Sequence, residues 1–139
     1  MAQILIIDDS PTDLHVFRTM LERHGFDVTT AQNAEEGISM AQRQCPQLIL
    51  MDIIMPGMNG FQATRQLSRD PATRDIPIVI VTNKDNATDK VWGMRQGAVD
   101  YLITPVKDSR LLKSIKGALE AAACAIHLLI RCAMWKCVR

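Results

Sequence analysis

Two stretches decide the fold: Ile4-Leu5-Ile6-Ile7-Asp8-Asp9 and Leu48-Ile49-Leu50-Met51-Asp52. Aliphatic runs without polar alternation are typical of strands covered on both faces, as in parallel sheets. If the two strands are parallel, Asp8, Asp9 and Asp52 meet at the carboxyl edge, where open α/β sheets bind ligands. At ~4 Å, each charged pair repels by roughly 4 kcal/mol at an effective dielectric near 20. A divalent cation relieves this repulsion, and all-oxygen ligation favours Mg²⁺.

The rest of the sequence alternates between strand and helix patterns. We expect strands near residues 3–8, 27–31, 47–52, 77–82 and 99–103, the second and last being outer strands. Helical patterns fill the gaps, with Ser10 and Asn33 as N-caps, a short helix over 60–68 and another over 85–96. This order predicts a doubly wound parallel sheet with right-handed crossovers.

The last helical pattern is unusually long. Apolar residues recur at three- and four-residue spacing from Leu112 to Ala133. A helix over 108–136 would be about 43 Å long, so its last turns should overhang the body or fold back on it. Two interpretations stay open: an amphipathic core helix with an apolar end, or a coiled-coil or domain-swapped homodimer seam. We expect one domain over 1–122 and an extension of the last helix over 123–139.

Composition excludes several classes of protein. Lys and Arg number 16 and Asp and Glu 15, so the net charge of +1 gives no general case for binding nucleic acid or a membrane. The longest apolar stretch, Ala121 to Ile126, is far shorter than the ~20 residues of a membrane span. We expect no secretory signal, because no basic n-region precedes an apolar h-region at the N-terminus. We therefore expect a soluble cytoplasmic protein.

Several short motifs now resemble those of one family. They are Asp8-Asp9-Ser10, Asp52 followed by Met55-Pro56-Gly57-Met58-Asn59-Gly60, Val81-Thr82, Gln96-Gly97-Ala98 with Asp100-Tyr101-Leu102, and Thr104-Pro105. In this order, at strand ends, they resemble the CheY-like receiver domains of bacterial response regulators from Ile4 to about Ala122. The stretches 60–67 and 91–98 look most like stand-alone regulators of type IV pilus twitching motility, the PilH type.

The resemblance implies a fold and a function. The fold would be flavodoxin-like, a five-stranded parallel sheet of order 2-1-3-4-5 with helices on both faces. The protein would be a single-domain response regulator of a two-component phosphorelay, accepting a phosphoryl group from a sensor histidine kinase and signalling by binding an unidentified downstream protein. It would catalyse only its own phosphorylation and dephosphorylation.

The resemblance also implies residue roles. Asp52 would accept the phosphoryl group. Mg²⁺ would be bound by Asp8, Asp9, Asp52 and the backbone carbonyl of Ile54. Thr82 would hydrogen-bond the phosphoryl group, and Tyr101 would turn inward on activation.

The chain departs from the family at one position. Receiver domains normally have a lysine after the fifth strand, where this sequence has Thr104. A charged hydrogen bond stabilises by roughly 1.5–3 kcal/mol against about 1 for a neutral one, so the response to phosphorylation should be weaker. Lys84 could replace the lost charge, whereas Lys107 should face away.

The leading alternative is a phosphorylation-independent interaction module, a degenerate receiver domain. A phosphohydrolase of the dehalogenase type is disfavoured, because it needs two acids on one side of the strand end, and Asp8 and Asp9 are adjacent. A flavin-binding protein is disfavoured because Asp8 and Asp9 would repel a phosphate there.

Overall fold

The computed structural model describes the backbone of residues 2–83 and 87–137, and the side chains of residues 2–83 and 88–122. Strands and helices alternate along the chain. They are β1 (Gln3–Ile7), α1 (Pro11–Arg23), β2 (Asp27–Ala31), α2 (Ala34–Gln44), β3 (Leu48–Met51), α3 (Gly60–Arg69), β4 (Ile78–Thr82), α4 (Ala87–Gln96), β5 (Asp100–Ile103) and α5 (Asp108–Cys137). The predicted order is confirmed. The predicted start of the fourth helix, at Asp85, lies outside the described residues.

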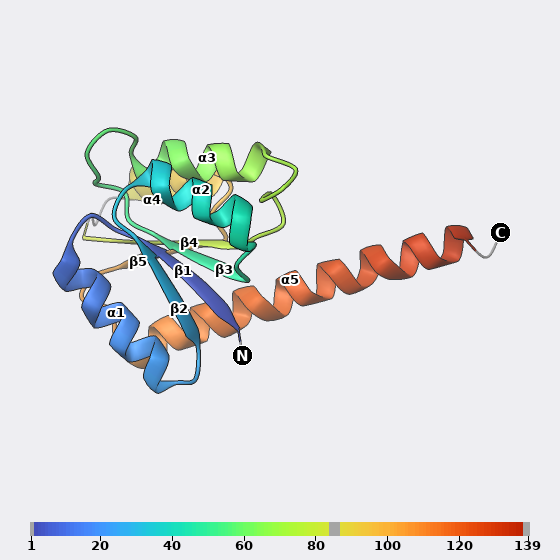
Figure 1. The fold of residues 1–139 in the computed structure, drawn as a ribbon, viewed down its shortest axis with the longest axis horizontal. Helices are drawn as coiled ribbons and strands as arrows, with labels where there is room; N and C mark the ends of the chain where they lie inside the picture. Colours follow the sequence, from blue (N-terminus) through green and yellow to red (C-terminus); the bar gives the residue numbers. More distant parts are fainter. Residues whose placement is uncertain (1, 84–86, 138–139) are drawn as a thin grey trace.

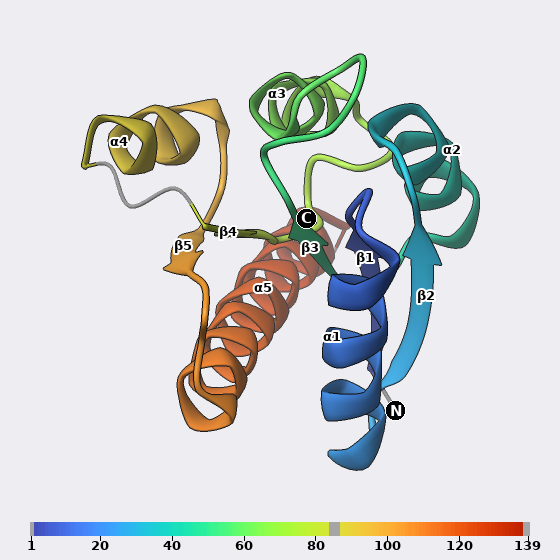
Figure 2. The ribbon, with the colours of Figure 1, turned by 90° about the vertical axis from the view of Figure 1, so that its left-hand side faces the viewer.

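The strands form one parallel sheet of order β2-β1-β3-β4-β5, as predicted, with β2 and β5 at its edges. Helices cover both faces. α2, α3 and α4 lie on one face, and α1 and α5 lie on the other (Figures 1 and 2). This arrangement explains why the central strands carry almost no polar residues, since both of their faces are covered by helices.

Side-chain alternation along each strand divides the core into two clusters. In β1, Ile4 and Ile6 join the cluster under α1 and α5, whereas Leu5 and Ile7 join the cluster under α2, α3 and α4. All four are at most 2% exposed. Successive strand residues point to opposite faces, so a fully apolar strand supplies both layers at once.

Local sequence sets the helix starts. The side chains of Ser10, Asn33 and Asn59 accept hydrogen bonds from backbone N–H groups in the first turns of α1, α2 and α3. Pro11 follows Ser10 in the first turn of α1, where its missing N–H costs nothing. Asn59 and Gln62 form a reciprocal capping box. Since α1 and α3 begin directly after the loops that follow β1 and β3, these caps fix the loops at the carboxyl edge.

Helix α5 has 30 residues, about 45 Å at the usual rise of 1.5 Å per residue. Its first half packs on the sheet through Leu111, Ile115 and Ala118. Its later turns extend beyond the body of the domain (Figure 1), as one of the two predicted outcomes. The side chains after Ala122 lie outside the described residues, so the homodimer seam stays a prediction.

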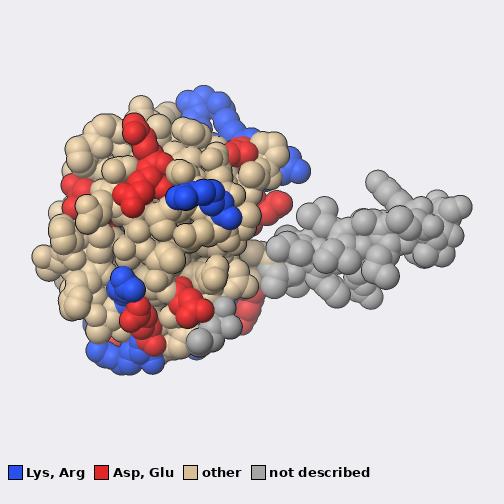
Figure 3. All heavy atoms as spheres, viewed as in Figure 1, with Lys and Arg blue, Asp and Glu red and all other residues tan. Residues whose placement is uncertain are grey.

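Charged groups are mixed on the face seen in Figure 3, where acidic and basic side chains are interspersed. The described residues of that face form no broad patch of one sign, in keeping with the net charge of +1. Among the described residues, no helix is both long enough and apolar enough to cross a bilayer.

The loop between β3 and α3 folds tightly against the end of β3. The backbone N–H of Gly60 donates to the Ile53 carbonyl at 2.9 Å. A Cβ at position 60 would collide with the Asp52 carbonyl oxygen and lie 2.8 Å from Ile53 Cα. Both obstacles are backbone atoms, so they cannot rotate away. Glycine at this position lets α3 begin directly beside Asp52.

We predict that Gly60→Ala lowers the free energy of unfolding by roughly 1–3 kcal/mol, because the added methyl displaces backbone. Gly117→Ala is the matched control: its Cβ meets nothing within 4 Å, so it should raise stability by about 0.5–1 kcal/mol through helix propensity. Urea unfolding followed by circular dichroism measures both. Equal effects of the two substitutions would contradict the tight loop.

Candidate functional site

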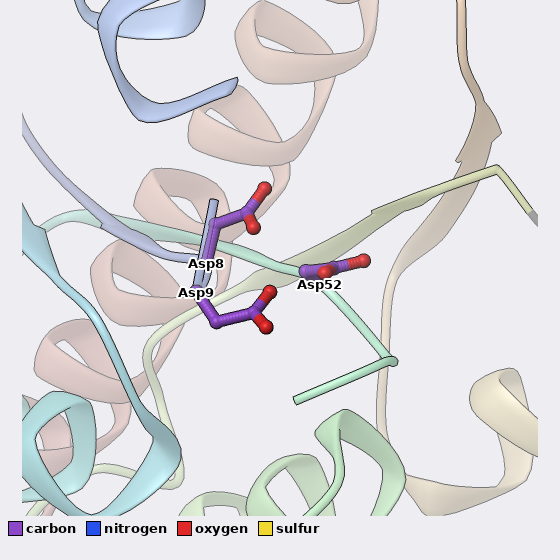
Figure 4. Close-up of side chains that lie close together, drawn as sticks. All are labelled: Asp8, Asp9 and Asp52. Carbon is purple, nitrogen blue, oxygen red and sulfur yellow. The ribbon is translucent and has the colours of Figure 1, made fainter. Parts of the chain in front are cut away.

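The register of the sheet brings the acids of two strands together. Ile7 of β1 pairs with Met51 of β3, so the next residues, Asp8 and Asp52, are also neighbours. The Asp52 N–H donates to the Ile7 carbonyl at 3.0 Å and extends the ladder by one bond. Asp8, Asp9 and Asp52 each offer a carboxylate oxygen, and these oxygens lie within 4.8 Å of one another. Figure 4 shows the three carboxyl groups projecting from the ends of β1 and β3 toward the same side.

The three acids differ in burial and in hydrogen bonding. Asp8 is 5% exposed, Asp52 is partly buried and Asp9 is exposed. One oxygen of Asp8 accepts from the Ser10 N–H at 2.9 Å, and one oxygen of Asp52 accepts from the Ile53 N–H, also at 2.9 Å. These bonds fix the orientation of both side chains and leave acceptor capacity on each carboxylate.

Burial and mutual repulsion disfavour ionisation of this cluster. Burial, together with the nearby charge of Asp8, raises the pKa of Asp52 to about 7. Burial likewise raises the pKa of Asp8 to about 6, against the lowering effect of the Ser10 N–H. Backbone donors therefore do not compensate for the clustered charge. A cation held by oxygen ligands would supply the missing compensation, and the donor set fits Mg²⁺.

A pocket of about 370 Å³ opens above the acids. Its lining includes six of the predicted site residues, which are Asp8, Asp9, Asp52, Ile54, Thr82 and Thr104. Ile54 was predicted to act through its carbonyl, and this residue is 52% exposed. The structure therefore brings these residues together, while their chemical roles stay predictions.

Thr82 ends β4 and is 2% exposed. Its carbonyl accepts from the Thr104 N–H at 2.8 Å, which ties the loop after β5 to the end of β4.

The structure places Tyr101 away from the pocket, in the core cluster beneath α2, α3 and α4, where it is 4% exposed. A Cβ at Gly93 of α4 would lie 3.4 Å from the Tyr101 ring, so α4 packs closely over it. Tyr101 is thus already inward in this structure, and its switching role is untested.

Thr104, which occupies the position where the family normally has a lysine, lines the pocket and is half-buried. Among the described residues that line the pocket, none is Lys or Arg. Lys107 is exposed and is not part of that lining. Lys84, the predicted replacement, lies outside the described residues.

Sequence reasoning missed other residues of the pocket. Ser10, Asp13, Phe17, Val81 and Asn83 also line it. Asp13 could have been found, because it lies one helical turn after Asp9 in a helix whose start the Ser10-Pro11 pair marks. No local signal distinguishes Phe17 from an ordinary core residue.

The comparisons with known proteins agree with this geometry. A family model described as the response regulator receiver domain matches residues 4–116. Protein PilH of Pseudomonas aeruginosa is 56% identical over 119 residues, which cover 86% of this chain and 98% of PilH. Response regulator PleD of Caulobacter vibrioides is 36% identical over 115 residues, which cover 83% of this chain and 25% of PleD.

Solved structures show the same fold. The chemotaxis protein CheY4 of Vibrio cholerae has a TM-score of 0.80 at 28% identity, over 85% of this chain and 98% of that one. A CheY-like receiver domain protein of Methanospirillum hungatei has a TM-score of 0.82 at 28% identity, over 88% and 97%. The predicted flavodoxin-like class is confirmed.

In the absence of metal, we predict that the acid cluster makes the folded state less stable as pH rises. Asp8 and Asp52 have pKa values of about 6 and about 7 in the folded state, whereas the ordinary pKa of an aspartate is 3.8. The free energy of unfolding contributed by this pair should therefore fall as pH rises from about 4 to about 7, by several kcal/mol, because each pKa unit corresponds to about 1.4 kcal/mol. Urea unfolding in the presence of a chelator, across this range, measures the effect.

Asp52→Asn is the control for this prediction, because it keeps the side-chain shape and removes one titrating group. The stability of this variant relative to wild type should rise steadily from pH 4 to pH 7. A difference between the two proteins that does not change with pH would contradict the raised pKa values.

Proposed function

Because this chain belongs to the response regulator receiver domain family, we propose that it is a two-component switch in which Asp52 accepts a phosphoryl group from a histidine kinase. The observation that carries the proposal is the meeting of Asp8, Asp9 and Asp52 in one pocket at the carboxyl edge of the sheet. Receiver domains are signalling domains, and their members share a role in two-component signalling.

In the proposed reaction, a carboxylate oxygen of Asp52 attacks the phosphorus atom of the donor. A new P–O bond forms while the P–N bond of a phosphohistidine breaks, and the electron pair leaves with the imidazole nitrogen. The Ile53 N–H, bonded to Oδ1 of Asp52, orients the carboxylate for attack. The partly enclosed pocket limits the access of water to the acyl phosphate.

Asp8, Asp9, Asp52 and the Ile54 carbonyl are the groups that would hold Mg²⁺. When bound, this ion would neutralise charge that develops on the phosphoryl oxygens and favour the ionised, nucleophilic form of Asp52. The all-oxygen donor set and the raised pKa values of Asp8 and Asp52 support the assignment.

The phosphorylated form would differ in charge and in hydrogen bonding. Phosphorylation adds about −1.5 to −2 charge and strong acceptor oxygens, if an acyl phosphate behaves like a phosphoester. The Thr82 hydroxyl could donate to these oxygens, and its loop would move with it. Since Thr82 and Thr104 are linked by a backbone hydrogen bond, such a movement would also reach the loop after β5. A shift of β5 would change the packing of the Tyr101 ring against α4.

A surface for a downstream partner is supported by exposed apolar side chains. Seven large hydrophobic residues are exposed within the described part of the chain, and five of them lie on α4, on β5 or between these elements. These five are Val91, Trp92, Met94, Val99 and Ile103. Exposed apolar groups concentrated in one segment are typical of interaction sites. The 56% identity to PilH supports a role in type IV pilus motility.

Mass spectrometry after incubation with acetyl phosphate and Mg²⁺ tests the proposal. We expect wild type to gain the mass of one phosphoryl group, and Asp52→Asn or the omission of Mg²⁺ to abolish the gain. A gain of equal size in Asp52→Asn would contradict Asp52 as the acceptor.

A second candidate function is favoured by the absence of a cation at Thr104. In a phosphorylation-independent module, partner binding would not change with the state of Asp52. The lack of Lys or Arg in the described lining of the pocket supports this alternative. The three intact acids argue against it, because an interaction module would not need them.

We predict that Thr104→Lys strengthens the response to phosphorylation, because a charged donor replaces a neutral one near the phosphoryl oxygens. A gain of about 1–2 kcal/mol would raise the active-to-inactive ratio roughly 5–30-fold. Hydrogen exchange of α4 and β5, with Mg²⁺ and with or without beryllofluoride, measures the response. We expect a small change in wild type and a larger one in Thr104→Lys. Identical changes in both proteins would contradict the weakened coupling.

A further inference from the structure

Asp13 is a fourth carboxylate in the pocket, and the family motifs do not account for it. It lies in the first turn of α1, one turn after Asp9, and lines the pocket together with Asp8, Asp9 and Asp52. Its backbone N–H is held at 3.4 Å by the side chain of Ser10, the N-cap of α1. This bond fixes the first turn of α1 relative to the end of β1.

The geometry separates Asp13 from the other three acids. Their carboxylate oxygens lie within 4.8 Å of one another, and Asp13 does not belong to that group. It is therefore too far away to share direct coordination of the same ion. Asp13 nonetheless lines the same pocket as the three acids. Any contact between Asp13 and an ion held by the other three acids would therefore pass through water.

The chemistry of Mg²⁺ gives this position a function. The ion is small, loses its water reluctantly and usually keeps several bound waters beside one or two carboxylates. Waters polarised by a dication are strong hydrogen-bond donors, and carboxylates outside the coordination shell accept from them. The described lining of the pocket offers four carboxylates and no Lys or Arg, so a hydrated cation is its electrostatic complement.

We propose that Asp13 is a positioning residue that binds the water shell of the Mg²⁺ ion and so strengthens metal binding at Asp8, Asp9 and Asp52. This inference rests on the proposed function, since it assumes that these three acids hold the ion. The same negative charge repels an anionic phosphoryl donor. Asp13 therefore increases metal affinity while slowing entry of the donor, and it makes the pocket more dependent on bound metal.

Isothermal titration of the metal-free protein with MgCl₂ tests the proposal without any measurement of activity. We expect Asp13→Asn to weaken Mg²⁺ binding about 10-fold, at the lower end of the effect of losing a carboxylate outside the coordination shell. Asp13→Glu should stay close to wild type, because a longer carboxylate still reaches the water shell. Asp27→Asn is the matched control, since it removes one exposed acid at the opposite end of the sheet, where β2 begins.

Two further readings separate positioning from a structural effect on α1. The difference between Asp13→Asn and wild type should shrink at high ionic strength, because salt screens an exposed charge. At saturating Mg²⁺, Asp13→Asn should react with acetyl phosphate at least as fast as wild type, because repulsion of the donor is reduced. Slower phosphorylation at saturating metal would overturn this part of the inference.

The outcomes distinguish the inference from the function on which it rests. If wild type binds Mg²⁺ and Asp13→Asn binds it equally well, or no worse than Asp27→Asn, the inference is wrong and the proposed function stands. If wild type itself does not bind Mg²⁺, or Asp52→Asn binds it unchanged, the proposed metal site is wrong and the inference fails with it.

Discussion

The repulsion among three carboxylates at one edge of the sheet is the constraint on which the rest of the structure depends. The register of β1 and β3 makes Asp8 and Asp52 neighbours, and burial keeps water from screening them fully. The Ser10 and Ile53 N–H groups compensate for only part of that charge, since the pKa values of Asp8 and Asp52 remain raised to about 6 and 7. A fold that only needed stability would place apolar residues here, so the cost indicates a chemical use.

The surrounding structure serves to hold these acids in place. Caps at Ser10 and Asn59 start α1 and α3 beside the strand ends, and Gly60 lets the loop after β3 approach the Asp52 carbonyl. On the other side of the pocket, a backbone hydrogen bond joins Thr104 to Thr82 and holds the ends of β4 and β5 together. Under the proposed function, a change of charge at Asp52 would reach β5 through these adjacent strand ends.

The sequence predicted those parts of the fold that depend on the spacing of apolar residues and on which residues end a strand. Unbroken apolar runs identified the central strands, and the weaker runs at 27–31 and 99–103 correctly became the edge strands β2 and β5. The meeting of Asp8 with Asp52 followed from strand polarity alone. Contacts across elements could not be predicted: Phe17 of α1 lines the pocket, and Tyr101 is buried where Gly93 lets α4 approach it. These depend on helix packing, which a single sequence does not encode locally.

The most direct test of the central claim is a crystal structure grown with Mg²⁺ and beryllofluoride. We predict an ion bound by oxygens of Asp8, Asp9 and Asp52 and by the Ile54 carbonyl, at about 2.0–2.1 Å, with the beryllium on Asp52. An ion bound elsewhere, or a pocket in which these acids stay uncoordinated at millimolar Mg²⁺, would contradict the claim that their clustering exists to hold a dication beside Asp52.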